Sequence, residues 1–565
     1  MQAQNSGNIP PELISYAEQI YFNGKIITVD GDFSIREAVA VRDGRILAVG
    51  TTAAVQRYGG PKTQRIDLGR KTMIPGIVDT HVHLQDQLSA ADVKAVMAKE
   101  PKYRDYRSIV KLDGQTLQQA LEDLRQTIAN RKPDTWVNAE FAVLSVAKEF
   151  EARVTRDDLD RVSPNNPLVV RSKQYAAGRI NTRGIEEFRK RFGAVPEEIS
   201  ETGEVDAIDE RVIVGDLLLE HPLESLYEPF KNRMKAYARY GVTTWASSLT
   251  PLTHINIFRE IDRRGEMPIR FAFSHSIGVT ANPEAWRFYQ RLGDLAGMGT
   301  EMLWISGSGI AVADREPMEP CTTLDTTKRC PLARKDAERR RALYEMVRNG
   351  QRLTSTHVSG DLAADYILDV IEQASADAGF TPEQIRAKSH ALDHCGMYPR
   401  PDQILRGVKL GIIWNCGADR IDKEVPEWLA RDYGEEYAHR WVAPVASILK
   451  AGGRVAGHGE SVKGDSFFVN ASMLVTRTNS KGVVWGKAEA VDRRVMLRMF
   501  TIWAAEYVSR ADRIGSIEVG KLADFAVLDK DLMAVPDDQL KSIKVLLTVV
   551  GGKVVFEAPT FAISK

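Results

Sequence analysis

The feature that most constrains the fold is an alternating pattern that runs from about residue 75 to about residue 510. Short apolar runs alternate there with long charged stretches of helical periodicity, such as LAADYILDVIEQASADAG. The runs are NPLVVRS, YGVTTWASS, PIRFAFSHS, MLWISGSG, RLTSTHVSG, KSHALDHCG, GIIWNCGA and GRVAGHGES. A strand followed by a helix, repeated about eight times, is typical of parallel βα units. The pattern predicts an α/β fold, most simply a (β/α)8 TIM barrel over residues 75–510.

The sequences at the two ends of the chain instead have the pattern of short strands joined by turns. Turn signals stand between apolar runs at Asn23-Gly24, Asp43-Gly44 and Gly551-Gly552. Asn-Gly and Asp-Gly dipeptides in this setting are strong hairpin signals. We therefore expect residues 1–74 and 511–565 to build one small β domain together.

The composition narrows the class of protein. Hydrophobic residues make up 43% and charged residues 27% of the 565 residues, and both Lys plus Arg and Asp plus Glu total 76. This is ordinary for a soluble protein, and the balanced charge gives no reason to expect nucleic-acid binding. The sequence contains no apolar run of membrane-spanning length and no signal-peptide pattern at its start. The expectation is a cytoplasmic enzyme with no membrane partner.

The chain has four cysteines, which are too few for a disulfide framework in a protein of this length. Cys321 and Cys330 have the spacing to pair within one loop, but two free thiols are the expectation for them.

The histidines carry the main chemical signal. In a (β/α)8 barrel the chemistry lies where strands end, and several of the ten histidines end apolar runs. His81 and His83 are two residues apart and would point the same way on a strand. His357 ends RLTSTH and His394 ends KSHALDH. A single histidine in such a place is more often a hydrogen-bonded core residue, but several together favour a site for zinc, iron, nickel or copper.

Five segments resemble those of a known family. PGIVDTHVHL after a β-rich segment is similar to the first-strand metal motif of the amidohydrolase superfamily. GSIEVGKLADFAVLD and VLLTVVGGKVVFE resemble the superfamily's C-terminal return to its small β domain. ETGEVDAI and THVSGDLAADYILDVIE resemble the N-substituted formamide deformylase-like branch.

The resemblance implies a deformed (β/α)8 barrel with a small β-sandwich-like domain and a catalytic divalent metal. Position by position, it makes His81 and His83 first-strand ligands, and His357 and His394 the ligands of the fifth and sixth strands. Zinc is the expected metal, with iron or manganese as the alternative.

Two departures from the family pattern bear on the reaction. GTEMLWISGSG contains no lysine that could be carboxylated to bridge two metals, so one metal is expected. The eighth strand reads VAGHGES where relatives have Gly-Ser-Asp, so His458, Gly459 or Glu460 stands at the position of the proton-accepting aspartate. Asp465 is a further candidate for the catalytic base.

These features predict hydrolysis of a C–N bond, in an amide or formamide-like small molecule, by a metal-activated water. Trp304, Tyr398, Trp414 and Tyr175 are expected to line a pocket for an apolar or ring-bearing substrate, although each could equally pack in the core.

The alternatives are an iron- or manganese-dependent oxygenase or lyase on the same fold, or a non-catalytic subunit. A homodimer is the expected assembly, and a hetero-oligomer with a homologue is the alternative.

Overall fold

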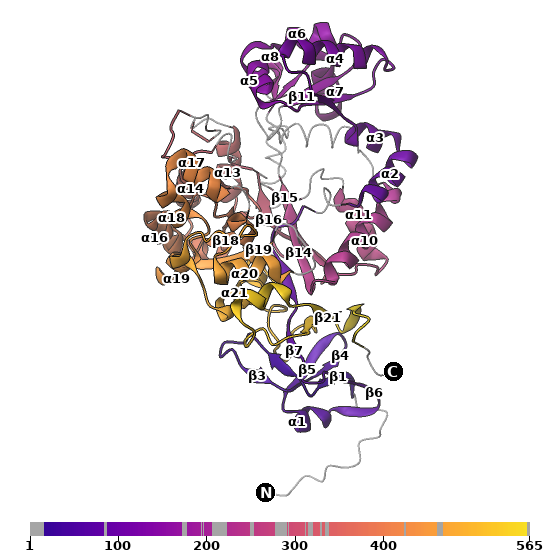
Figure 1. Ribbon diagram of the computed structural model, residues 1–565, viewed down its shortest axis with the longest axis vertical. Coiled ribbons are helices and arrows are strands. Elements are labelled where there is room, and N and C mark those ends of the chain that lie inside the picture. Colours follow the sequence, from indigo (N-terminus) through magenta and orange to yellow (C-terminus); the bar gives the residue numbers. More distant parts are fainter. Residues whose placement is uncertain are drawn as a thin grey trace, which may run out of the picture.

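The computed structural model describes residues 16–561, apart from 84–87, 172–177, 194, 196, 206–222, 249–253, 277–290, 292, 311, 315–319, 328–329, 331, 334–337, 423–424 and 460–466. Three residues predicted to belong to the site, Tyr175, Glu460 and Asp465, lie outside the described residues. The described chain is an α/β structure with strands of both ends at one pole and helices gathered around the middle (Figure 1).

Two sheets gather the strands from the ends of the chain. A six-stranded sheet has the order β22-β21-β20-β7-β2-β3, and so combines strands that are far apart in sequence. Its members are β2 (Lys25–Ile27), β3 (Ile35–Arg36), β7 (Thr72–Pro75), β20 (Phe525–Leu528), β21 (Val545–Val550) and β22 (Lys553–Glu557). The second sheet has the order β5-β4-β1-β6, with β1 (Ala17–Phe22), β4 (Ala38–Arg42), β5 (Arg45–Gly50) and β6 (Gly59–Asp67). A short helix, α1 (Thr52–Gln56), joins β5 to β6.

A shared hydrophobic cluster holds these two sheets together. Tyr21 of β1 and Phe525 of β20 are fully buried in it, with ring centroids 5.8 Å apart. Strands from both termini therefore pack on one another, while the domain limits at residues 74 and 511 stay a prediction.

The predicted turns form, with one difference in what they connect. Asp43-Gly44 joins the antiparallel pair β4 and β5, and Gly551-Gly552 joins β21 and β22; all four residues have positive φ. Asn23 also has a positive φ, at 55°, but β1 pairs with β4 and β6 whereas β2 pairs with β3 and β7. The Asn23-Gly24 turn therefore carries the chain from one sheet to the other and does not close a hairpin.

The middle of the chain contains parallel strands in sequence order. One sheet has the order β16-β15-β14-β8, with β8 (Ile77–Asp79), β14 (Val242–Ser248), β15 (Arg270–Ser276) and β16 (Leu303–Gly309). A second sheet contains β17 (Ala391–His394), β18 (Ile413–Gly417) and β19 (Arg454–His458). Single parallel backbone pairings join residues 353–357 to both sheets, through Ser308–Leu353 and His357–Asp393. This succession is the one expected of βα units, and complete closure into a barrel stays a prediction.

Helices follow these strands as the periodicity predicted. Their bounds are α10 (Tyr227–Ala238), α11 (His254–Arg263), α13 (Glu338–Arg348), α14 (Asp361–Asp377), α15 (Pro382–Lys388), α16 (Pro401–Leu410), α17 (Val425–Tyr433), α18 (Glu435–Trp441), α19 (Val445–Lys450), α20 (Phe468–Thr476), α21 (Arg493–Met499) and α22 (Ile502–Tyr507). Short 3-10 turns are η3 (Glu224–Leu226), η4 (Ala418–Ile421), η5 (Lys487–Glu489) and η6 (Asp537–Ser542). Local signals set their ends: Thr381 and Gln384 form a capping box before α15, and Gly411 ends α16 in the left-handed conformation.

One of the predicted parallel strands belongs to a different sheet. NPLVVRS forms β11 (Leu168–Arg171), which lies within a five-stranded sheet of order β13-β12-β11-β10-β9. The other members are β9 (Ile109–Leu112), β10 (Val137–Phe141), β12 (Gly178–Ile180) and β13 (Glu204–Val205), and α4 (Leu117–Ala129), α5 (Leu144–Arg153), α6 (Arg156–Val162), α7 (Thr182–Phe192) and α8 (Glu197–Thr202) accompany them.

This sheet has its own hydrophobic cluster, and Figure 1 shows it at the pole opposite the terminal sheets, beyond α2 (Ala90–Lys99) and α3 (Pro101–Arg107). We call residues 109–205 the inserted unit. NPLVVRS was predicted among the parallel strands of the barrel, and that assignment is wrong because its strand pairs within this separate sheet. The barrel limits at residues 75 and 510 stay a prediction.

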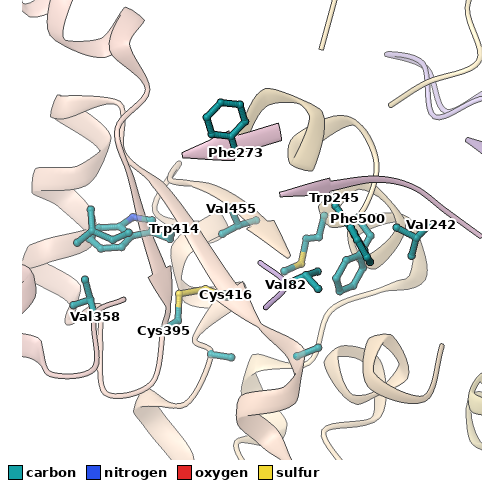
Figure 2. Close-up of a cluster of buried hydrophobic side chains, with 14 of the residues drawn as sticks. Val82, Val242, Trp245, Phe273, Val358, Cys395, Trp414, Cys416, Val455 and Phe500 are labelled. Carbon is teal, nitrogen blue, oxygen red and sulfur yellow. A yellow bond between two sulfur atoms is a disulfide. The ribbon is translucent and has the colours of Figure 1, made fainter. Parts of the chain in front are cut away.

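The expectation that Cys321 and Cys330 are free thiols is also wrong. Disulfides join Cys321 to Cys330 and Cys395 to Cys416. The second lies within a cluster of buried side chains that includes Trp414 and Val358 (Figure 2). It joins the residue after β17 to β18, so it fixes the chain immediately beyond His394.

Within the described residues, no helix is long and apolar enough to cross a membrane.

Candidate metal centre

Five histidine rings meet where the parallel strands end. His81 lies two residues after β8, His357 closes the segment between the two parallel sheets, and His394 and His458 are the last residues of β17 and β19. The ring of His394 has its centroid 4.1 Å from that of His357, 4.5 Å from that of His81 and 5.0 Å from that of His458. His83 completes the group, 4.8 Å from His81. We call these five residues the imidazole cluster.

The structure thus brings together the four histidines predicted as metal ligands and one of the predicted catalytic residues. Their role in binding a metal stays a prediction. The parallel succession explains the meeting, because side chains at the carboxyl ends of neighbouring parallel strands share one edge of the sheet.

His81 is held in place through both of its ring nitrogens. Its Nδ1 lies 2.8 Å from Oδ2 of Asp393, and its Nε2 lies 3.1 Å from Nε2 of His83. Asp393 is fully buried on β17. A carboxylate is an acceptor, so it retains the proton on Nδ1 of His81 and leaves the lone pair on Nε2. A metal is ligated by an unprotonated imidazole nitrogen of this kind.

His394 and His458 form a second close pair. Nδ1 of His394 lies 3.2 Å from Nε2 of His458, and both side chains are buried. Nε2 of His394 is buried and has no hydrogen-bond partner among the described residues. Burial and, next, Arg420 hold the pKa of His394 well below its usual value of 6.5, so this imidazole is neutral.

The backbone at His394 is unusual. His394 has a φ of 101° and Cys395 a φ of 53°, a region that side chains other than glycine rarely adopt. Strained backbone of this kind is found where the surrounding structure enforces it, often at functional sites. The Cys395–Cys416 disulfide and the pairing of β17 with β18 supply that enforcement here.

Two buried carboxylates border the imidazole cluster. Asp79 is fully buried; its Oδ1 accepts from the Gly459 backbone at 3.0 Å, and its Oδ2 has no hydrogen-bond partner among the described residues. Burial raises the pKa of Asp79 to about 7. Asp419 places Oδ1 3.6 Å from Nδ1 of His458. Both carboxylates lie close to the end of β19, the position at which the resemblance leaves His458, Gly459 or Glu460 in place of an aspartate.

The donor set fits an imidazole-bound divalent cation. As the side chains stand, no group of three or more His, Cys, Asp or Glu residues in the described part of the chain is arranged to hold a metal ion. The ring nitrogens of two histidine pairs face one another instead. The buried and unpartnered Nε2 of His394 and the Nε2 lone pair of His81 are nevertheless the atoms a metal such as zinc takes as ligands.

The predicted aromatic residues pack in the interior. Trp304 is buried and donates from Nε1 to the Val508 carbonyl at 2.8 Å. Tyr398 is buried and donates from its hydroxyl to the Asp393 carbonyl at 2.5 Å. Trp414 is fully buried in the cluster of Figure 2. All three residues therefore pack in the core, which was the alternative to lining a pocket. Their contact with a substrate stays a prediction.

Sequence reasoning missed the polar residues behind the imidazole cluster. Asp393, Asn415 and Tyr507 are buried and hydrogen-bonded to one another, and Asp79 and Asp419 lie beside His458 or Gly459. Asp79, Asp393 and Asn415 stand within the strand-end motifs VDTHVH, ALDHC and IWNCG. A search for every polar residue inside these apolar runs, and not for histidine alone, would have found them.

The fold and the imidazole cluster point to a class of protein, and sequence similarity to known proteins identifies that class. The chain matches the amidohydrolase family over residues 64–556, and it therefore belongs to that family. The expectation of an amidohydrolase-type hydrolase is thereby confirmed.

Among individual proteins, the chain is similar to N-substituted formamide deformylase of Arthrobacter pascens, with 25% identity over 95% of this chain and 97% of the relative. It is 23% identical to putative amidohydrolase YtcJ of Bacillus subtilis strain 168, over 95% of this chain and 99% of that protein. A crystal structure of an uncharacterized metal-dependent hydrolase from Pyrococcus horikoshii has the same fold, with a TM-score of 0.59 and 19% identity over 92% of this chain and 99% of the other.

Proposed function

We propose that this protein is a metal-dependent amidohydrolase that cleaves a C–N bond, of the amide or formamide kind, in an apolar or ring-bearing small molecule. The observation that carries the proposal is the imidazole cluster, in which five histidines from four segments of the chain lie with neighbouring ring centroids 4.1 to 5.2 Å apart. The full-length similarity to a formamide deformylase supports the choice of bond. The proposal includes closure of the parallel strands into a deformed (β/α)8 barrel.

His81, His83, His357 and His394 would hold one divalent metal, with zinc favoured by an all-imidazole donor set and iron or manganese as the alternative. When bound, such a cation lowers the pKa of water and polarises a carbonyl oxygen. Asp393 keeps the proton of His81 on Nδ1, so Nε2, which lies 3.1 Å from Nε2 of His83, carries the lone pair that a metal would take.

Of the three candidates for the catalytic base, His458 is the one among the described residues, and it lies in the imidazole cluster. Its Nε2 faces His394, and the carboxylate of Asp419 lies 3.6 Å from its Nδ1, where it can stabilise a protonated ring. Glu460 and Asp465, the other candidates for the base, follow closely in sequence.

Two measurements test the proposal together. Elemental analysis of the purified protein should find about one divalent metal per chain, as a mononuclear site requires. A panel of N-substituted formamides and amides should be hydrolysed by the metal-loaded protein, and His81→Ala should lose both the metal and the activity. Full activity in metal-free protein, or in the His81→Ala variant, would contradict the proposal.

The nitrogen-rich donor set also favours one second candidate, an iron- or manganese-dependent oxygenase or lyase. His458 lies in the cluster where relatives place a carboxylate, and that exchange suits a different metal chemistry. Oxygen uptake during turnover of the iron-loaded protein separates the oxygenase from the hydrolase, because hydrolysis consumes no oxygen, and the identity of the products separates the lyase from both.

The disulfides bear on the proposed surroundings of the protein. The sequence predicted a cytoplasmic protein, whereas Cys321–Cys330 and Cys395–Cys416 are typical of proteins in oxidising compartments. Thiol titration of unreduced protein from its natural source decides this point, since a reduced cytoplasmic protein would show four thiols. The assembly we propose is a homodimer, with a hetero-oligomer as the alternative, and light scattering of the purified protein measures it.

A further inference from the structure

A buried polar network lies directly behind the imidazole cluster, and its centre is Asp393. Oδ2 of Asp393 lies 2.8 Å from Nδ1 of His81, and the Tyr507 hydroxyl donates to both carboxylate oxygens, at 2.9 and 3.1 Å. Nδ2 of Asn415 donates to Oδ1 at 3.0 Å. We propose that Asp393 is a positioning residue: it fixes the ring orientation and tautomer of His81, and Tyr507 and Asn415 fix Asp393 in turn. The proposal rests on the proposed function, because it concerns how one proposed ligand is prepared for the metal.

The described structure shows no second role for the Asp393 carboxylate. Asp393 is fully buried, and no Lys or Arg of the described chain forms an ion pair with it. Burying an aspartate away from water and without a cation is costly unless several donors satisfy it. Here two neutral donors and His81 do so, and each comes from a different segment of the chain.

The partners of Asp393 are themselves anchored at the strand ends that carry the cluster. The Tyr507 hydroxyl accepts from the Ser355 backbone at 3.0 Å, two residues before His357. Oδ1 of Asn415 accepts from the Thr80 hydroxyl at 2.7 Å, and Thr80 also donates to the Gly457 carbonyl at 3.0 Å. Thr80 precedes His81, and Gly457 precedes His458. The network therefore sets the positions of three strand ends relative to Asp393.

The tautomer follows from the direction of these hydrogen bonds. Tyr507 and Asn415 donate to the carboxylate, so Asp393 presents acceptors and His81 supplies the proton from Nδ1. In an Asp393→Asn variant, the amide oxygen would stay with the two donors and the amide NH2 would face His81. Nδ1 would then act as an acceptor, and the proton would move to Nε2, the nitrogen proposed for the metal.

Two variants and one matched control test the inference. Asp393→Asn is expected to weaken zinc binding by about 10- to 100-fold, the usual effect of removing a partner that orients a ligand. Tyr507→Phe is expected to weaken zinc binding less, because it removes one support of the carboxylate and leaves the bond to His81. Tyr398→Phe is the control: its buried hydroxyl also bonds to Asp393, but to the main-chain carbonyl, so zinc affinity should not change. Competition with a chelator on metal-free protein measures the three affinities.

A spectroscopic readout separates positioning from a merely structural role. Histidine labelled with 15N in metal-free wild-type protein should show Nδ1 protonated in His81, with the signal assigned by its loss in His81→Gln. The same residue should show Nε2 protonated in Asp393→Asn. A wild-type His81 protonated on Nε2, or wild-type zinc affinity in Asp393→Asn, would overturn the inference.

A different experimental result would contradict the proposed function. A wild-type protein that binds no divalent metal would contradict that function, while the tautomer of His81 in the wild type would still decide whether Asp393 positions it.

Discussion

His390 shows how one buried side chain makes stability depend on pH. Burial and, next, Arg352 lower the pKa of His390 from 6.5 to about 3, and its Nδ1 accepts from the Leu353 backbone at 3.0 Å. Between these two pKa values the unfolded chain binds a proton that the folded chain does not. The stability contributed by neutral His390 is therefore complete above about pH 6.5 and is lost as the pH falls.

The prediction concerns the slope of stability against pH. Replacing His390 with Asn keeps an acceptor for Leu353 and removes the titrating group, so the variant should lose about 1.4 kcal/mol less per pH unit than the wild type below pH 6. Urea unfolding midpoints from pH 7 to pH 4.5 measure the difference. Parallel curves for the two proteins would show that His390 is not neutral in the fold.

Gly417 gives a second prediction at the residue scale. A Cβ at this position would lie 2.5 Å from Cε1 of His458 and 2.5 Å from Oδ1 of Asp419. Gly417→Ala should displace the His458 ring, reduce activity severalfold and lower the free energy of unfolding by about 1–3 kcal/mol. Gly31→Ala is the control, because no atom lies within 4 Å of the added Cβ there. Equal activity in both variants would exclude a role for the position of His458.

The residues that sequence reasoning found are those with the least ambiguous chemistry. His81, His83, His357 and His394 could be predicted because each is an imidazole at the end of an apolar run. A search for polar residues in the apolar runs would have picked out Asp393 as well, but its role could not be predicted, because no periodicity shows whether a carboxylate within a strand faces a histidine from another strand. Its meaning depends on His81, Asn415 and Tyr507, and only the tertiary fold brings these together.

At the scale of elements, the inserted unit shows the limit of pattern reasoning. Its strand-and-helix texture is the same as that of the surrounding βα units, so LVVR of β11 could be predicted as a strand but not assigned to its sheet. Sheet membership depends on pairing partners, and β11 pairs with β10 and β12. Most of the other runs form parallel strands that pair in sequence order, whereas RLTSTHVSG contributes single backbone pairings at Leu353 and His357.

The separate core of the inserted unit leads to a prediction. Phe150 is fully buried there, with its ring centroid 4.8 Å from that of Phe141. Phe150→Ala should cost about 3–5 kcal/mol, and the loss should be confined to residues 109–205. Hydrogen exchange should accelerate in that segment alone, while zinc affinity is retained. Phe525→Ala in the terminal sheets should give the converse pattern, and uniform acceleration in both variants would mean that the chain unfolds as one unit.

For the whole molecule, a buried ion pair connects the parallel strands to the terminal sheets. Arg270 at the start of β15 donates from Nε and Nη2 to Asp524, at 2.7 and 2.9 Å, and both side chains are buried. Asp524 also accepts from the Gly551 backbone at 2.7 Å. These bonds make the C-terminal segment part of the support of β15.

Removing one partner of the Arg270–Asp524 pair should therefore lower the free energy of unfolding substantially. Asp524→Asn leaves the guanidinium buried without its counter-charge, and we expect a loss of about 3–5 kcal/mol in the free energy of unfolding. Glu266→Gln, which breaks an exposed pair with Lys231, should leave the denaturation midpoint unchanged. Urea unfolding compares the two variants, and equal midpoints would mean that the buried pair contributes little.

The six-stranded terminal sheet also has a consequence for the synthesis of the chain. β7 is complete by residue 75, but its partner β20 begins only at residue 525. Translation of a chain of this length takes tens of seconds. For most of that time the edge of β7 that pairs with β20 has no partner strand. The nascent protein therefore has a period in which a chaperone, or another nascent chain, can occupy this edge. A chain released before residue 525 lacks β20 and therefore cannot complete the sheet.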